Sequence, residues 1–153
     1  MKPMENAYVS LGVQTFLSGI VMYFVMFVMI DTTSSFYNNL NMFYMTLMMV
    51  APMVVLMILA MVHMFSSKQA NIILIAIAIV AFFGSFALIR TQTTIGNRAF
   101  VRSMVPHHSG AVLMCQKASL TDPELVTLCG EIIKSQRQEI DQMKRILARL
   151  NSV

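Results

Sequence analysis

Three long runs without charged residues limit what this chain can fold into. Val9–Ile30, Met42–Phe65 and Ala70–Ile89 each reach the roughly 20 residues that a helix needs to cross a bilayer. Within them and their linkers only Asp31 and Lys68 are charged. A soluble bundle could bury one such run, but a chain of 153 residues with 57% hydrophobic and 12% charged residues has too little polar surface to cover three. We therefore predict a three-helix transmembrane domain over residues 1–90.

The remaining residues, 91–153, carry most of the charge and form the predicted second domain. From Arg90 onward the chain contains nine of its eleven Lys and Arg residues and five of its seven Asp and Glu residues. A net charge of +4, scattered along the tail, does not indicate a nucleic-acid partner. The charges flanking the spans hardly decide the orientation, since Lys2 and Lys68 lie on one side and Arg90, Arg98 and Arg102 on the other. The first run lacks a signal-peptide cleavage site, so we expect it to be retained.

Methionine is unusually frequent, with 16 residues. In the second run the methionines recur every three or four residues, at Met42, Met45, Met49, Met53, Met57, Met61 and Met64, and a shorter stripe in the first run contains Met22, Met26 and Met29. Thioethers are soft ligands suited to Cu(I), but methionine is also a flexible apolar residue that fills gaps between membrane helices. For the spans alone the second interpretation is favoured. His63 lies close to the end of its span and to Lys68, which favours a solvated histidine.

The tail is predicted to be a helical hairpin. The segment TQTTIGN interrupts the third run, and Asn97 is a suitable N-cap for a helix that continues to about Ser119. Asp122 and Pro123 then form a strong start signal, because aspartate caps a helix and proline fits its first position. Nothing interrupts the second helix before Leu150.

Each predicted tail helix has a row of residues spaced alternately three and four apart, as in helices that pack at a shallow angle. The first row contains Phe100, Met104, His107, Ala111, Met114 and Ala118, with His108 on its flank beside Val101, Val112 and Cys115. The second contains Leu125, Cys129, Ile132, Gln136, Glu139, Met143, Ile146 and Leu150. If the connection is tight, facing residue numbers sum to roughly 241. This register places the histidines about one turn from Gln136, and Cys115 about one turn from Cys129.

Polar groups that meet inside a helix interface need a partner or a bound ion. Met104 precedes His107 and His108 by three and four residues, and Met114 and Cys115 follow them by seven. Imidazole, thioether and perhaps thiolate groups match Cu(I), and Zn(II) is a weaker alternative that would need both cysteines. Carboxylates are too few here for Ca, Mg or a di-iron centre, and the chain lacks paired Glu-x-x-His motifs and nucleophile motifs, so an enzyme is not expected.

Other interpretations of these residues remain open from the sequence. His107 and His108 could simply form hydrogen bonds with Gln136 and Glu139 across the hairpin. Pro106 could break the first helix just before the histidines, or start a new helix at its first position. The two cysteines, Cys115 and Cys129, could form a disulfide in an oxidising compartment or remain thiols that bind metal.

The tail resembles a known family. The pattern FVRSMVPHHSGAVLM, followed by DPEL and IIKSQRQEIDQM, is similar to the CopM-like domain, the family of the domain of unknown function 305. The resemblance covers Asn97–Leu150, and the residues that stand where the family pattern has them are Met104, Pro106, His107, His108, Gln136, Glu139, Ile140 and Met143. It implies a ferritin-like four-helix arrangement and, for members with a known role, periplasmic copper binding through Met and His residues.

Together these observations predict an all-α protein of the bacterial inner membrane. The nearly even count of flanking charges leans toward a cytoplasmic hairpin, whereas the family resemblance implies a periplasmic one, which we adopt as the expectation. Because one hairpin has too few helices to bury both rows, we expect two chains to pair as a homodimer that completes a four-helix bundle. The expected function is soft-metal binding, most readily of Cu(I), in homeostasis or tolerance. The expected ligands are Met104, His107, His108 and Met143, supported by Met114 and Cys115, with Gln136 and Glu139 orienting the imidazoles. The alternative is a membrane adaptor or oligomerisation scaffold in which the histidines are structural.

Overall fold

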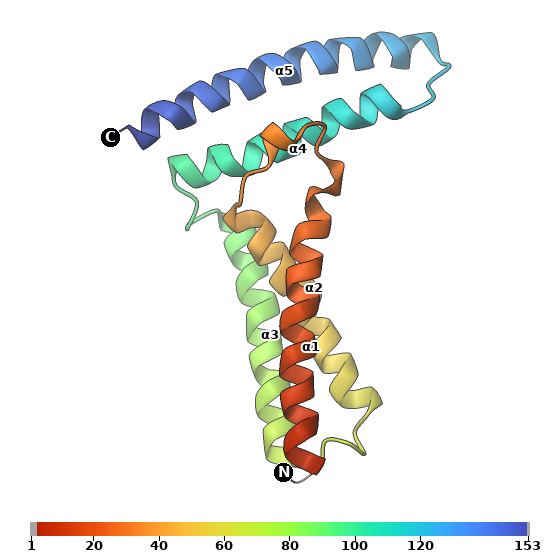
Figure 1. Ribbon diagram of the computed structural model, residues 1–153, viewed down its shortest axis with the longest axis vertical. Coiled ribbons are helices and arrows are strands. Elements are labelled where there is room, and N and C mark those ends of the chain that lie inside the picture. The colour runs from red at the N-terminus through yellow and green to blue at the C-terminus, as the bar shows by residue number, and fades with distance from the viewer. Residues whose placement is uncertain (1–2, 153) are drawn as a thin grey trace. The chain divides into compact units, whose positions relative to one another are not determined.

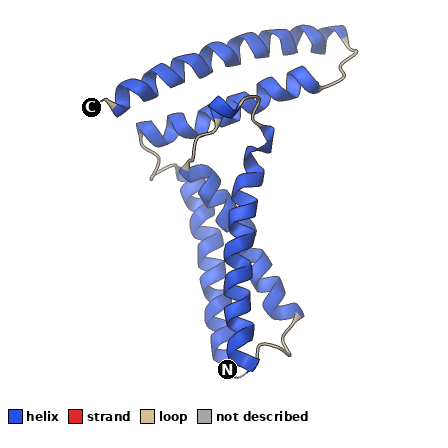
Figure 2. Cartoon of the chain, viewed as in Figure 1, coloured by secondary structure: helices blue, strands red, loops and turns tan. Residues whose placement is uncertain are grey.

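Every regular element in the computed structural model, which describes residues 3–152, is a helix (Figures 1 and 2). In chain order the elements are α1 (Pro3–Val25), the 3-10 helices η1 (Met26–Met29) and η2 (Thr33–Ser35), α2 (Leu40–Ala60), α3 (Lys68–Thr91), α4 (Asn97–Lys117) and α5 (Pro123–Asn151). The predicted all-α fold is confirmed. Lys2, which enters the charge argument above, lies outside the described residues.

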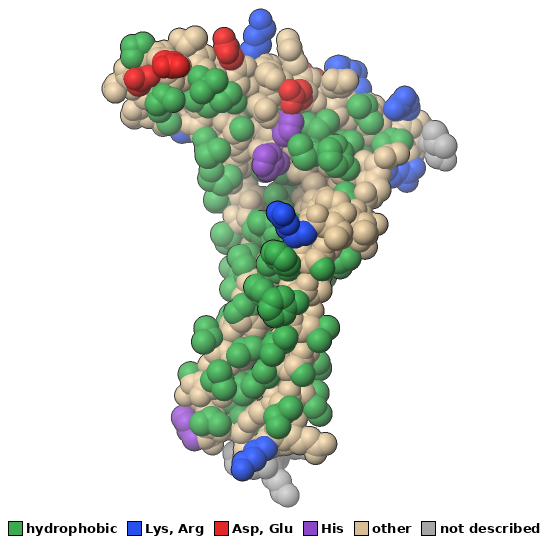
Figure 3. Space-filling model, turned by 180° about the vertical axis from the view of Figure 1, so that it is seen from behind, with side chains coloured by type: hydrophobic (Ala, Val, Ile, Leu, Met, Phe, Trp, Pro, Cys, Tyr) green, Lys and Arg blue, Asp and Glu red, His purple; other side chains and the backbone are tan. Residues whose placement is uncertain are grey.

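Three segments are long and apolar enough to span a membrane: Ala7–Met29, Leu40–Ala60 and Lys68–Thr91. They overlap the three predicted runs, and hydrophobic side chains cover much of their surface (Figure 3). Ser67 caps α3 by accepting a hydrogen bond from the Ala70 N–H at 3.3 Å. At the other end Gln92 adopts the left-handed conformation, with φ of 54°, and stops the helix in the segment where the sequence predicted a break.

The chain forms two compact units that do not coincide with a single cut in the sequence. Unit 1 contains the chain up to Val25 together with Asn41–Thr93, and unit 2 contains Met26–Leu40 together with the chain from Thr94 onward. The predicted division into residues 1–90 and 91–153 differs from this arrangement in one respect. The linker between the first two spans packs with the C-terminal hairpin.

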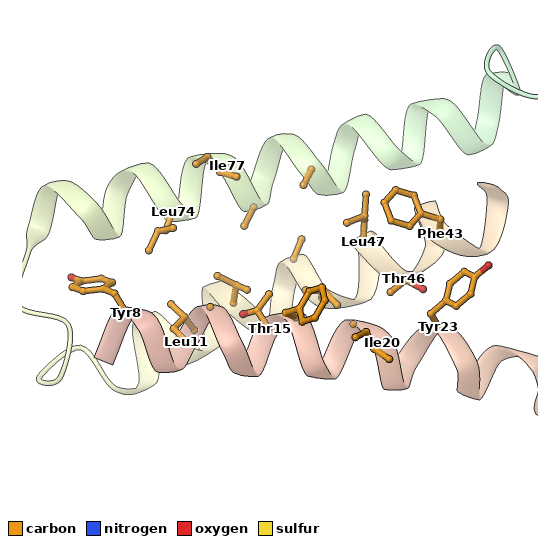
Figure 4. A pocket seen from close by; sticks show the side chains of 18 of the residues that line it. Tyr8, Leu11, Thr15, Ile20, Tyr23, Phe43, Thr46, Leu47, Leu74 and Ile77 are labelled. Atoms are coloured by element: carbon orange, nitrogen blue, oxygen red, sulfur yellow. The ribbon is translucent and has the colours of Figure 1, made fainter. Parts of the chain in front are cut away.

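Polar side chains fasten unit 1 at both ends. The Tyr8 hydroxyl donates to Asn71 Oδ1 at 2.8 Å, and Asn71 Nδ2 donates to the Phe65 carbonyl at 2.8 Å. At the opposite end Asn41 and Gln92 join their amides through two hydrogen bonds of 3.2 and 3.0 Å. Between these ends α1, α2 and α3 line an open groove of about 690 Å³, apolar except for a few Thr and Tyr hydroxyls (Figure 4). Such a surface suits contact with lipid tails.

Unit 2 is built on the antiparallel pair α4 and α5 (Figure 1). Asp122 caps α5 as predicted, because its Oδ1 accepts hydrogen bonds from the N–H groups of Glu124 and Leu125 at 3.0 Å. Pro123 is the first residue of the helix, also as predicted. Pro106 is buried inside α4, which continues on both sides of it. The alternative in which a new helix begins at Pro106 is therefore wrong.

The face of α4 that packs on α5 is not the row that the sequence suggested. The core contains Val101, Val105 and Val112, of which Val105 has no exposed surface. These residues lie on the predicted flank, next to His108 and Cys115. Phe100 and Met114, from the predicted row, are 52% and 55% exposed. The prediction chose the wrong side of the helix because α4 carries apolar residues on more than one side.

The second helix follows its prediction more closely, although the register differs. Ile140 and Leu147 are its buried core residues, with Ile133, Met143 and Ile146 packed against them. A register of roughly 241 would place Cys115 opposite Val126, whereas Cys115 is bonded to Cys129. The true register is therefore displaced by about one helical turn.

We expect Leu147→Ala to destabilise the hairpin by about 2–5 kcal/mol, because the truncation leaves a cavity in the core of unit 2. Leu147 is only 4% exposed. Leu128, on the same helix, is 48% exposed, and Leu128→Ala should change the stability by much less. Hydrogen exchange of α4 and α5 amides in the detergent-solubilised protein measures both variants. Equal exchange in the two variants would contradict the observed face of α5.

Candidate metal-binding site

His108 is the best-defined member of the candidate site. Its side chain is 13% exposed, and its Nδ1 lies 3.1 Å from Glu139 Oε2 on the facing helix. The two atoms are within ion-pair distance but are not aligned for a hydrogen bond, so Nδ1 has no hydrogen-bond partner among the described residues. Glu139 is held by its other oxygen, which accepts from the Ser135 hydroxyl at 2.8 Å. A carboxylate facing Nδ1 leaves Nε2 as the nitrogen that can bind a metal.

The surroundings of His108 favour the neutral imidazole that a metal requires. Burial lowers the pKa of His108 below its ordinary value, Glu139 opposes this effect by raising it, and the neighbouring His107 lowers it again. The burial effect is the largest of the three. At neutral pH the ring is therefore uncharged and has a nitrogen lone pair available for coordination.

The contact between His108 and Glu139 also fixes which thioethers lie nearby. In an antiparallel pair, one turn back along α4 leads from His108 to Met104, and one turn forward along α5 leads from Glu139 to Met143. Met104 and Met143 are both half-buried, and Met143 packs against the core of unit 2. The register thus sets two thioethers, from two helices, opposite each other at about one helical turn from the His108 imidazole.

The other predicted ligands are less enclosed. His107 is exposed, and its ring centroid lies 6.0 Å from that of His108. Met114 lies two turns further along the same side of α4 as His107. Gln136 is half-buried, but its Oε1 accepts no hydrogen bond within the described part of the chain, and no contact with an imidazole is seen. Of the two residues predicted to orient the imidazoles, the structure places Glu139 against His108.

Cys115 is excluded as a candidate metal ligand. It forms a disulfide with Cys129, with a Cα–Cα distance of 5.2 Å, and neither cysteine has a free thiol. A disulfide sulfur is not the thiolate that binds Zn(II) or Cu(I). The bond instead closes the hairpin, and a loop of this length contributes about 3 kcal/mol. Over residues 3–152 no group of three or more His, Cys, Asp or Glu side chains is placed to hold a metal, so the candidate donors are imidazole and thioether.

Comparisons with known proteins place the hairpin in a family. Residues 87–147 match the model of the Domain of unknown function (DUF305). An uncharacterized protein of Acanthamoeba polyphaga mimivirus is 39% identical over 112 residues, which cover 71% of this chain and 71% of the viral protein. The chain belongs to the DUF305 family. The stretch aligned with the viral protein is longer than the DUF305 match, and few residues follow Leu147, so the similarity extends into the membrane-spanning part. No solved structure was found to match the chain.

The DUF305 match does not include the linker Met26–Leu40, which the sequence analysis treated only as a connection. In unit 2 the Asp31 N–H donates to the buried Ser109 hydroxyl at 2.8 Å. A Cβ on Gly110 would lie 3.4 Å from the Met29 carbonyl oxygen, so the small residue permits this close approach. Tyr37 packs against the core of the hairpin. The small pair Ser109 and Gly110, directly after the histidines, was the available signal that another segment covers this side of α4.

A polar network joins the linker to both helices of the hairpin. In the orientation that satisfies its neighbours, the Gln116 amide donates to Asp31 Oδ1 at 2.8 Å and accepts from Arg137. This network has one residue from each segment: Asp31 from the linker, Gln116 from α4 and Arg137 from α5. Lys144 of α5 also donates to the Ser34 hydroxyl at 3.0 Å. The linker therefore holds the side of α4 that carries Ser109 and Gly110, and it also reaches the beginning of the helix, where Asn39 accepts from the Ser103 hydroxyl at 3.5 Å.

We expect Glu139→Gln to lower the pKa of His108 further, because the carboxylate raises it in the native protein. NMR titration of the imidazole signals measures the change, with Glu131→Gln, an exposed carboxylate on the same helix, as the control. Because the unfolded chain binds a proton at His108 more readily than the folded chain, hairpin stability should fall as pH drops below about 6.5. A raised pKa in Glu139→Gln would contradict the arrangement of this pair.

Proposed function

We propose that the hairpin binds a soft metal ion, most readily Cu(I), in metal homeostasis or tolerance. The observation that carries the proposal is the contact between His108 and Glu139, which leaves one imidazole nitrogen available and sets Met104 opposite Met143. Imidazole and thioether groups are the donors that Cu(I) accepts. Zn(II) is disfavoured because its sites in proteins usually include thiolates or several imidazoles, and both cysteines are in the disulfide.

His107 would be a further candidate ligand in this proposal. It lies on the adjacent side of α4, where the exposed ring can turn toward an ion held by Met104 and His108. The metal is treated as cargo, since DUF305 membership itself assigns no activity and fold alone does not define function.

The disulfide supports placing the hairpin on the oxidising side of the membrane. Disulfides persist outside the cytoplasm and are rare within it. In a bacterial cell this is the periplasmic side of the inner membrane. The first linker packs with the hairpin in unit 2, and three spans put these two segments on the same side.

A second candidate is a membrane adaptor or oligomerisation scaffold. The favouring observation is that His108 and Glu139 can also act as a structural pair across the hairpin. In either case we propose that two hairpins pair as a homodimer, because one side of α4 exposes Phe100 and Met114.

Competition with a Cu(I) chelator, using the full-length protein in detergent, tests the metal proposal. We expect His107→Ala/His108→Ala and Met104→Leu/Met143→Leu each to weaken Cu(I) binding by about tenfold or more. The leucine substitutions keep the side-chain volume, so the fold should persist. His63→Ala, which removes an exposed histidine in unit 1, should leave the affinity unchanged. Unchanged affinity in the double histidine variant would favour the scaffold function.

A reporter fused after Val153 tests the orientation. We expect alkaline phosphatase to be active at this position, because that enzyme folds only where its disulfides can form. A fluorescent protein that matures only in the cytoplasm should be dark at the same site. The opposite pair of results would place the hairpin in the cytoplasm and contradict the compartment inferred from the disulfide.

A further inference from the structure

One side of α4 remains uncovered after the packing of unit 2. The helix holds α5 through Val101, Val105 and Val112, and it holds the linker through Ser109 and Gly110. The remaining side, here called the outer face, contains Phe100, Met104, His107, Ala111, Met114 and Ala118. Its residues are spaced alternately four and three apart, which is the spacing of a helix that packs along another helix.

The outer face is apolar except for His107, although it lies outside the membrane-spanning segments. Phe100 and Met114 each expose more than half of their side chains. Large apolar residues aligned on a water-exposed helix indicate a surface that is covered in the working protein. The candidate donors Met104 and His107 belong to this same surface.

We propose that the outer faces of two chains pair antiparallel about a two-fold axis, so that Met114 of each chain completes the metal site of its partner. This inference rests on the proposed function. Beyond that function, it states that the partner chain supplies a further ligand and explains why the chains would form a homodimer.

The outer face is complementary to itself in this arrangement. An axis midway between His107 and Ala111 sets Phe100 opposite the partner's Ala118 and His107 opposite the partner's Ala111. The two ring side chains, Phe100 and His107, then each meet an alanine. Met104 meets the partner's Met114, so two thioethers meet beside the histidines. A two-fold interface requires this property, because the same residues serve both sides.

The charges of the hairpin favour the antiparallel direction. Arg98 and Arg102 begin α4, and Arg145 and Arg149 lie near the end of α5, beside them in the hairpin; the Arg98 guanidinium reaches the Leu150 carbonyl. At the opposite end the three acidic residues Asp122, Glu124 and Glu131 outnumber the two basic residues Lys117 and Lys134. Antiparallel pairing places the basic end of one hairpin beside the acidic end of its partner, whereas parallel pairing would place like charges together.

The added thioether suits the chemistry of the site. Each hairpin supplies the His108 imidazole and, about one helical turn away, the thioethers of Met104 and Met143. The partner's Met114 arrives next to Met104 and His107, on the side that this chain leaves open. A soft ion such as Cu(I) then has nitrogen and sulfur donors from both chains.

Subunit complementation in full-length protein tests the inference. One chain carries Met104→Leu/His107→Ala/His108→Ala and keeps Met114, while the other carries only Met114→Leu. Two different tags allow the heterodimer to be purified, and Cu(I) affinity is measured by chelator competition. The Met114→Leu homodimer should bind about tenfold more weakly, or worse, than the unsubstituted protein. In the heterodimer, the chain that keeps Met104, His107 and His108 receives Met114 from its partner. One of the two sites should therefore bind Cu(I) with the affinity of the unsubstituted protein. Met64→Leu, an exposed methionine of unit 1, is the matched control.

The outcomes separate this inference from the proposed function. If the unsubstituted protein binds no Cu(I), the proposed function fails and the inference falls with it. If Cu(I) binds and Met114→Leu weakens it without recovery in the heterodimer, Met114 acts within its own chain and the inference is overturned. A monomer in lipid nanodiscs with full Cu(I) affinity also overturns it, since no Met114 from a partner would then be present. Recovery in the heterodimer, with Met64→Leu unchanged, supports the shared site.

Discussion

Val105 and Val112 have almost no exposed surface because α5 covers them, while Ser109 and Gly110, on a neighbouring side of α4, lie under the linker Met26–Leu40. This burial on two sides holds α4 in place. Its position decides which residues face α5 and which face outward. His108 lies at the edge of the α5 interface and meets Glu139, whereas His107, only one residue earlier and about 100° around the helix, stays exposed. The candidate chemistry therefore depends on the rotation of one helix about its own axis.

Features set by local or composition signals could be predicted from the sequence. The three spans follow from length and apolar character, and the start of α5 follows from Asp122 and Pro123. The packing face of α4 could not be predicted in the same way. Phe100 and Met114 fit a helical repeat as well as Val101 and Val112 do, and only tertiary contact selects between them. The linker was missed for a related reason. Asp31 and Ser109 are far apart in sequence, and neither belongs to a periodic pattern.

The sequence predicted the residue types of the candidate site, but it did not predict which residues of the two helices face each other. The pairing of Cys115 with Cys129 is displaced by about one helical turn from the simplest estimate, and the contact of His108 with Glu139, which sets Met104 opposite Met143, is displaced by nearly two. The sequence left the cysteines as ligands or as a disulfide, and their geometry selects the disulfide. The disulfide removes the thiolates from the candidate site and leaves imidazole and thioether groups, which are neutral donors. Neutral donors suit a monovalent soft ion, because little charge has to be buried with it.

The packing of Met26–Leu40 against the hairpin has a consequence for biogenesis. This segment leaves the ribosome before the second and third spans, yet the surface that it covers is synthesised after them. Unit 2 can therefore be completed only after the second and third apolar helices have been synthesised. A fragment that starts after the third span would carry Ser109 and Gly110 without their cover. The folding of the hairpin thus depends on a segment that precedes both of these helices in the chain.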